Sequence, residues 1–254
     1  MQGKPIDMSD FIATSLADGV LTIRMNRPDK KNAIDRPMYR AMTAALRRSD
    51  SEEGIGATLI LGVPGAFSAG NDIADFIAFA TSGGEGDEVE SFLYALANSR
   101  KPLLAAVDGL AIGIGTTLLM HCDMVFAAPG STFRTPFLDL GLVPEAGSSL
   151  LAPQMMGQQR AFALLAMGEK FDAEEARAAN LVYRIVDSAD LEGMAVKAAT
   201  ALASKPRQAM QIARDFVRGP RAPVIERIEA ELREFKQRLS SDEARAAFQA
   251  FMTR

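Results

Sequence analysis

Short apolar runs alternate with turns and helical segments along the first half of the chain. Residues 11–16 and 20–25 are rich in β-forming residues and flank Asp18-Gly19, a pattern typical of a β-hairpin. Helical periodicity begins near Arg36-Pro37, where proline is tolerated because the first turn of a helix leaves its N–H groups unpaired. Residues 57–63 form a continuous apolar run that predicts a buried strand.

The rest of the chain repeats the succession of strand, turn and helix, which predicts an α/β core. No stretch is rich enough in proline or serine to separate independent domains. A polar, glycine-rich break at 81–88 predicts a loop. The other predicted elements are helices at 72–80 and 115–121, strands at 103–107, 123–128, 132–134 and 182–186, and helices over most of the chain after residue 161.

Two glycine-rich runs, residues 66–72 (AFSAGND) and 109–115 (GLAIGIG), each join a predicted strand to a predicted helix. Small residues at such a junction let the backbone turn sharply and approach a ligand closely. Two junctions of this kind can direct two backbone N–H groups at one oxygen. Such a pair stabilises the negative charge that develops on a thioester carbonyl oxygen when an enolate forms.

The composition narrows the classes of function. The 254 residues are 48% hydrophobic and 24% charged, which suits one globular α/β unit with a large core. A net charge of −4 argues against nucleic acid as a partner, because phosphate contacts need a basic face. The single cysteine and single histidine exclude a disulfide framework and a cysteine-based zinc cluster, and they remove most metal sites and Ser/His triads.

Targeting signals are not visible in the sequence. Asp7 and Asp10 lie where a secretory signal would be apolar, and no run of about 18 apolar residues occurs. We therefore expect a cytoplasmic protein with no membrane span.

Four motifs together resemble the enoyl-CoA hydratase/isomerase (crotonase) superfamily. They are residues 26–33 (NRPDKKNA), the two glycine-rich runs and residues 141–149 (GLVPEAGSS), and the resemblance extends from about residue 11 to the C-terminus. It implies an α/β, crotonase-like spiral of ββα units at 1–200, with a helical trimerisation region at 201–254 in the same structural unit. It also implies an acyl-CoA substrate, no separate cofactor, and a homotrimer or a dimer of trimers.

The predicted C-terminal helices are amphipathic. Residues 224–239 and 243–252 place isoleucine, leucine and phenylalanine at helical spacing, so these positions need a partner surface. That surface could belong to the chain's own core or to another subunit. The resemblance favours the subunit interface.

The resemblance assigns the two backbone donors of an oxyanion hole to Asn71 and Ile114. Each follows a glycine, Gly70 or Gly113, and the N–H groups act whatever the side chains are. Losing one such donor typically costs about 3 kcal/mol of transition-state stabilisation. The alternative is that both glycine runs only form tight turns.

The acid and base of the hydratase reaction are missing from their usual places. In hydratases of this superfamily, two glutamates activate water, and the corresponding positions here are Thr117 and Phe137. Phenylalanine cannot transfer a proton, and a threonine hydroxyl is too weak an acid or base at neutral pH. A hydratase would therefore need some other acid here.

Glu145 resembles the glutamate of peroxisomal-type Δ3,Δ2-enoyl-CoA isomerases. In those enzymes one carboxyl moves a proton between C2 and C4 of the acyl chain. Apolar neighbours such as Phe137 and Leu142, with Thr117 completing the predicted pocket, would exclude water and raise the carboxyl pKa. Glu145 could instead cap a helix starting near Ser148, in a non-catalytic acyl-CoA-binding or scaffolding protein.

The coenzyme A site is predicted from the same motifs. Arg27, Lys30 and Lys31 form a basic cluster where the superfamily binds the adenosine end, although such a cluster could also be a solvated turn. Asp72 could equally cap the helix that follows it. The predicted contacts are Arg27, Lys31, Ala33, Ala69, Gly70, Asp72 and Gly113.

Overall fold

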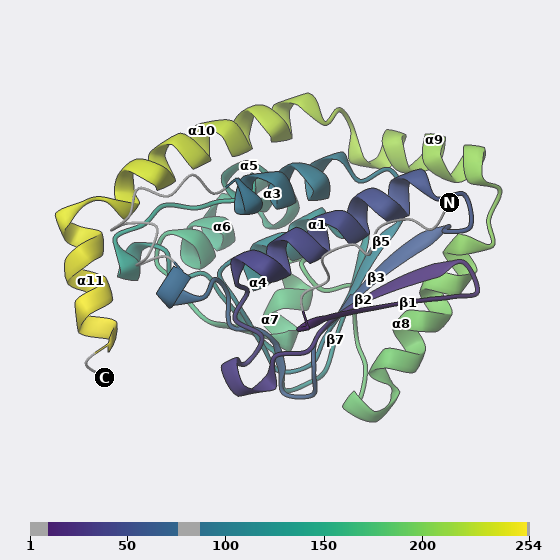
Figure 1. Ribbon diagram of the computed structural model, residues 1–254, viewed down its shortest axis with the longest axis horizontal. Helices are drawn as coiled ribbons and strands as arrows, with labels where there is room; N and C mark the ends of the chain where they lie inside the picture. The colour runs from purple at the N-terminus through teal and green to yellow at the C-terminus, as the bar shows by residue number, and fades with distance from the viewer. Residues whose placement is uncertain (1–9, 76–86, 253–254) are drawn as a thin grey trace.

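A computed structural model describes residues 10–75 and 87–252, whose strands form two sheets (Figure 1). In the larger sheet β1 is antiparallel to β2, and the remaining neighbours are parallel. In the smaller sheet only β9 is antiparallel to its neighbour. The larger sheet has the order β1 (Ile12–Ala17), β2 (Val20–Met25), β3 (Ala57–Leu61), β5 (Leu103–Val107), β7 (Met124–Ala127) and β10 (Arg184–Ile185), and the smaller has β4 (Ala66–Ser68), β6 (Leu110–Ile112), β8 (Thr132–Arg134) and β9 (Phe171–Asp172).

The chain forms a spiral by passing repeatedly from the larger sheet to the smaller one. It does so from β3 to β4, from β5 to β6 and from β7 to β8, and helical segments follow these pairs. Successive corners pack closely: Gly109 has φ 84°, and a Cβ there would lie 2.0 Å from the carbonyl oxygen of Gly65 in the neighbouring corner. Only glycine fits such a position. The predicted spiral of ββα units is confirmed.

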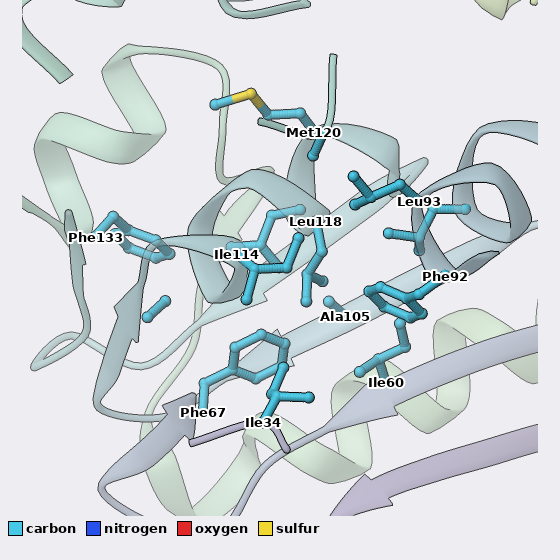
Figure 2. Packing of buried hydrophobic residues seen from close by; sticks show 14 of the residues in the cluster. Ile34, Ile60, Phe67, Phe92, Leu93, Ala105, Ile114, Leu118, Met120 and Phe133 are labelled. Atoms are coloured by element: carbon cyan, nitrogen blue, oxygen red, sulfur yellow. The ribbon is translucent and has the colours of Figure 1, made fainter. Parts of the chain in front are cut away.

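Both faces of the larger sheet are covered, which explains why its strands are continuously apolar. Ile60 and Ala105 point into the main core beneath helices α1 (Arg36–Ser51) and α3 (Glu88–Asn98). Figure 2 shows both side chains near Phe92 of α3. Leu59 on the opposite face packs with helix α8 (Ser188–Ala203).

Most predicted elements are present with small shifts. The helix expected at 115–121 begins at Ile114, as α4 (Ile114–Thr117) followed by the 3-10 turn η2 (Leu118–His121). Residues 73–75 are helical, whereas 76–80 of that predicted helix and 81–86 of the predicted loop lie outside the described residues. The remaining elements are η1 (Pro28–Lys30), η3 (Leu138–Leu140), α5 (Ser148–Met156), α6 (Gln158–Leu165), α7 (Ala173–Ala178), α9 (Arg207–Arg218), α10 (Ala222–Leu239) and α11 (Asp242–Met252).

The C-terminal helices bury their apolar faces against their own chain. In Figure 1, α10 runs over α3 and α5, and α11 follows it and contacts η3. For the buried side chains named below, the chain's own core and not another subunit supplies the partner surface, and the trimer itself stays a prediction. Helical spacing identifies an apolar face but does not identify which chain covers it. The buried side chains are Ile228, Leu232, Phe235, Leu239 and Phe248. None of the helices in the described ranges is long and apolar enough to cross a membrane.

Replacing Ile228 with alanine should lower the free energy of unfolding by about 2–5 kcal/mol, because the side chain is fully buried in the core. Urea denaturation measures the change. The matched control is Glu229→Ala on the exposed side of α10, which should change stability by less than about 0.5 kcal/mol. Equal effects of the two substitutions would contradict the packing described for α10.

Candidate active site

Two glycine bends lie in contact at one end of the smaller sheet. The parallel pairing of β4 with β6 brings together the bend at Gly70 and the bend at Gly113. Both glycines have positive φ, 90° and 54° respectively. A Cβ on Gly70 would lie 2.9 Å from the carbonyl oxygen of Ile112, and a Cβ on Gly113 would lie 4.0 Å from the Cα of Gly70. A side chain at Gly70 would force the bends apart, whereas at Gly113 the positive φ is what favours glycine.

Each bend carries a backbone N–H that has no acceptor among the described residues. Ile34 donates to the carbonyl of Gly70 and accepts from the N–H of Asp72, so the intervening N–H of Asn71 is left unpaired. Ile114 is the first residue of α4, where an N–H has no partner within the helix. Its side chain is anchored in the core beside Phe67 and Leu118 (Figure 2). An oxyanion hole needs such a pair of free donors on adjacent bends.

Asn32 holds the first bend in place. It is fully buried with φ 55°, and its side chain accepts from the Arg27 N–H at 2.7 Å and donates to two carbonyl oxygens of β4. Its own carbonyl accepts from the Ser68 hydroxyl, which in turn accepts from the Gly70 N–H at 3.1 Å. The sequence motif contained Asn32, but only its burial reveals this supporting role.

Glu145 is buried next to the first bend. Only 2% of the residue is exposed, and its carboxylate is hydrogen-bonded to the side chain of Asn71. The Tyr39 hydroxyl donates to the Asn71 Oδ1 and so fixes the same side chain from the other direction. Glu145 Oε1 has no partner among the described residues. One carboxylate oxygen of Glu145 is thus buried close to the bend that carries Asn71.

The surroundings of Glu145 make it an unusually basic carboxyl. Burial raises the pKa of Glu145 to about 8, and the negative charge of Glu231 acts in the same direction. The hydrogen bond with Asn71 opposes both effects by favouring the ionised form. A carboxyl with such a pKa is well matched to accepting and returning a proton near neutral pH.

The alternative role of Glu145 as a helix cap is wrong. The first turn of α5 is capped by Glu231 of α10, whose carboxylate accepts from the Gly147 N–H at 2.6 Å and the Ser149 N–H at 2.9 Å. The Glu145 side chain makes no capping bond to α5. Its buried carboxyl therefore has no such structural task.

A cavity of about 650 Å³ adjoins the two bends. Phe137 and Leu142 line it, but Thr117 does not. Thr117 ends α4 and is fully buried, and its hydroxyl has no partner in the described part of the chain. The walls are mostly apolar, and α10 and α11 supply part of them. The lining residues are Ala69, Gly70, Asn71, Ile73, Ile112, Gly113, Arg134, Pro136, Phe137, Asp139, Leu140, Leu142, Phe235, Ala247 and Ala250.

Arg27 and Asp72 bind each other. Arg27 Nη1 lies 2.7 Å from Asp72 Oδ2 and donates to the carbonyl of Ala33 at 2.9 Å. Asp72 Oδ1 also accepts from the Ala74 N–H at 3.0 Å, so the predicted capping alternative for Asp72 is realised. Both side chains therefore stabilise the bend, and the Arg27 guanidinium is already paired with a carboxylate.

The other predicted coenzyme A contacts are more open. The Lys31 side chain is exposed, and its backbone, at φ 48°, accepts from the Ala69 N–H at 2.9 Å. Ala69, Gly70 and Gly113 line the cavity. Within residues 10–75 and 87–252, no group of three or more His, Cys, Asp or Glu side chains is placed to hold a metal ion.

A model of the enoyl-CoA hydratase/isomerase family matches residues 15–254. The chain belongs to this family. Its members act on coenzyme A thioesters and typically use no other cofactor.

Relatives within the enoyl-CoA hydratase/isomerase family carry two kinds of name. Enoyl-CoA delta isomerase 2 of Rattus norvegicus is 33% identical over 99% of this chain and 66% of its own length. A probable enoyl-CoA hydratase of Mycobacterium leprae is also 33% identical, over 94% of this chain and 95% of its own. The chain thus spans about two thirds of the rat protein, and overall identity does not separate the two activities.

Solved structures of the family share the fold. The enoyl-CoA hydratase/isomerase from Pseudoalteromonas atlantica T6c superposes with a TM-score of 0.91 at 37% identity, covering 96% of this chain and 97% of that one. The family's spiral and its C-terminal helices are therefore common to both proteins.

The Arg27–Asp72 pair should show a coupling of about 0.5–3 kcal/mol in a double-mutant cycle, because the two side chains are largely buried and in direct contact. Urea denaturation of Arg27→Gln, Asp72→Asn and the double variant measures this energy. Additive losses would mean that the pair does not stabilise the bend.

Proposed function

We propose that the protein moves the double bond of an enoyl-CoA thioester from the 3,4 to the 2,3 position, with Glu145 as the only acid–base residue. The observation that carries this proposal is the buried Glu145 carboxyl beside Asn71 of the first glycine bend, one oxygen of which has no partner among the described residues. A lone carboxyl suffices for this reaction, because the proton that leaves the substrate also returns to it.

The proposed reaction has two proton transfers. The thioester carbonyl oxygen accepts from the N–H groups of Asn71 and Ile114, and Glu145 removes a proton from C2. The C–H electron pair forms a dienolate whose negative charge rests on the carbonyl oxygen, where the two donors stabilise it. Protonated Glu145 then delivers the proton to C4, the C=O bond re-forms, and the remaining double bond lies between C2 and C3.

The cavity walls suit a reaction in which water takes no part. Phe137, Leu142 and Phe235 are apolar and mostly buried, so the dienolate would be kept away from bulk solvent. Hydration of a 2-enoyl-CoA is the second candidate, supported by relatives named as probable hydratases. It would require Glu145 alone to serve both water and C2, since Thr117 and Phe137 offer no carboxylate.

Glu145→Gln should reduce turnover of a 3-enoyl-CoA by at least about 10²-fold, because glutamine cannot accept the proton from C2. Conjugation of the product is followed by ultraviolet absorbance, and binding of a saturated acyl-CoA is measured by calorimetry. Binding should change little, because glutamine keeps the size and polarity of the side chain.

The same measurements distinguish the alternatives. Turnover that survives Glu145→Gln would contradict the proposed role of this residue. Turnover only of a 2-enoyl-CoA with water would identify a hydratase. Binding of acyl-CoA esters without any reaction would identify a non-catalytic protein.

The isomerase kcat/KM should fall about tenfold per pH unit below about pH 8, because only the ionised form of Glu145 can take the proton. The pKa of Glu145 lies near 8 in the folded protein, so the active form accumulates as the pH rises through this value. A pH series of initial rates measures the apparent pKa of kcat/KM. An apparent pKa near 4.5, the ordinary value for glutamate, would contradict the buried environment described above.

A further inference from the structure

The turn that carries Glu145 has a backbone that needs support. Ala146 has φ 63° and Gly147 has φ 69°, so two successive residues occupy the left-handed region. This region is unfavourable for alanine and persists only where surrounding contacts hold it. The supports of the turn therefore help to fix the position of Glu145.

Two side chains hold this turn from opposite sides. His121 Nε2 lies 2.7 Å from the carbonyl oxygen of Ala146. On the other side, Glu231 accepts from the Gly147 N–H and from both the N–H and the hydroxyl of Ser149, the last at 2.5 Å. Only 7% of Glu231 is exposed. A buried carboxylate with three donors ties α10, in the C-terminal region, directly to the turn that carries Glu145.

We propose that Glu231 is a positioning residue, which fixes the turn of Glu145 through these three hydrogen bonds and brings a second carboxylate to that turn. The catalytic meaning of this role rests on the proposed function, but the two physical effects do not. Glu231 lies too far along the chain for any sequence motif to connect it with Glu145.

The titratable groups around Glu145 determine which charges act on its carboxyl. Tyr39 of α1 has its pKa raised by burial and stays neutral, and burial lowers the pKa of His121 to about 4, so it is also neutral near pH 7. Burial raises the pKa of Glu231 as well, but its three donors and the nearby Arg227 favour its ionised form. A negative charge on Glu231 acts in the direction that raises the pKa of Glu145.

Titration of the two carboxyls tests the proposal without using turnover. Protein labelled with ¹³C at the glutamate carboxyls is titrated by NMR, and Glu145→Gln assigns the Glu145 signal. In Glu231→Gln the pKa of Glu145 should fall by about half a unit or more, because the repelling charge is gone. Glu234→Gln, which removes an exposed charge from the same helix, should leave it unchanged.

Amide hydrogen exchange tests whether the three hydrogen bonds of Glu231 hold the turn. Glu231→Asp keeps the charge but shortens the reach, so exchange at Gly147 and Ser149 should accelerate about fivefold or more while the Glu145 pKa stays raised. Should Glu231→Gln fail to fold, Ser149→Ala removes one donor without disturbing either charge and should accelerate exchange at Gly147 similarly.

Two results would overturn the role of Glu231. One is an unmoved Glu145 titration in Glu231→Gln, and the other is unchanged exchange at Gly147 in both Glu231→Asp and Ser149→Ala. Failure of the proposed function gives a different result, because wild-type protein without isomerase turnover would still show these shifts.

Discussion

The parallel pairing of β4 with β6 is the constraint on which the candidate site depends. It brings the bends at Gly70 and Gly113 into contact and leaves on each one N–H that has no acceptor within residues 10–75 and 87–252. The spiral that produces this pairing also places α5 and α10 around the same point, so that Glu145 is enclosed beside Asn71. The backbone thus supplies the stabilisation of negative charge, and a single side chain supplies the proton transfer.

Enclosing Glu145 has a cost for stability. Because its folded-state pKa is raised above the ordinary value, the folded protein binds the proton more tightly than the unfolded chain does. The contribution of Glu145 to the free energy of unfolding is therefore highest below the ordinary pKa of glutamate. It declines as the pH rises towards about 8. In the described part of the chain no cation is paired with this buried carboxyl. Such a carboxyl is typical of sites where activity, rather than stability, determines the residue.

Local patterns in the sequence predicted the strands and the glycine bends, because each depends on residues close together in the chain. The role of Glu231 could not be predicted, since it acts on a turn more than 80 residues earlier in the chain. The covered face of α10 could not be assigned for a related reason: periodicity shows that Ile228 and Leu232 are apolar but not what they contact. The sequence alone similarly predicts a free cation at Arg27, because its contact with Asp72 is visible only in the structure. The homotrimer stays a prediction.

The most direct test follows the hydrogen atom itself. A 3-enoyl-CoA carrying deuterium at both C2 positions is converted in ordinary water, and the product is examined by NMR for deuterium at C4. If one enclosed carboxyl removes and returns the same atom, much of the product should carry deuterium at C4. Product formed at full rate with only solvent hydrogen at C4 would contradict a single-residue shuttle in a site closed to water.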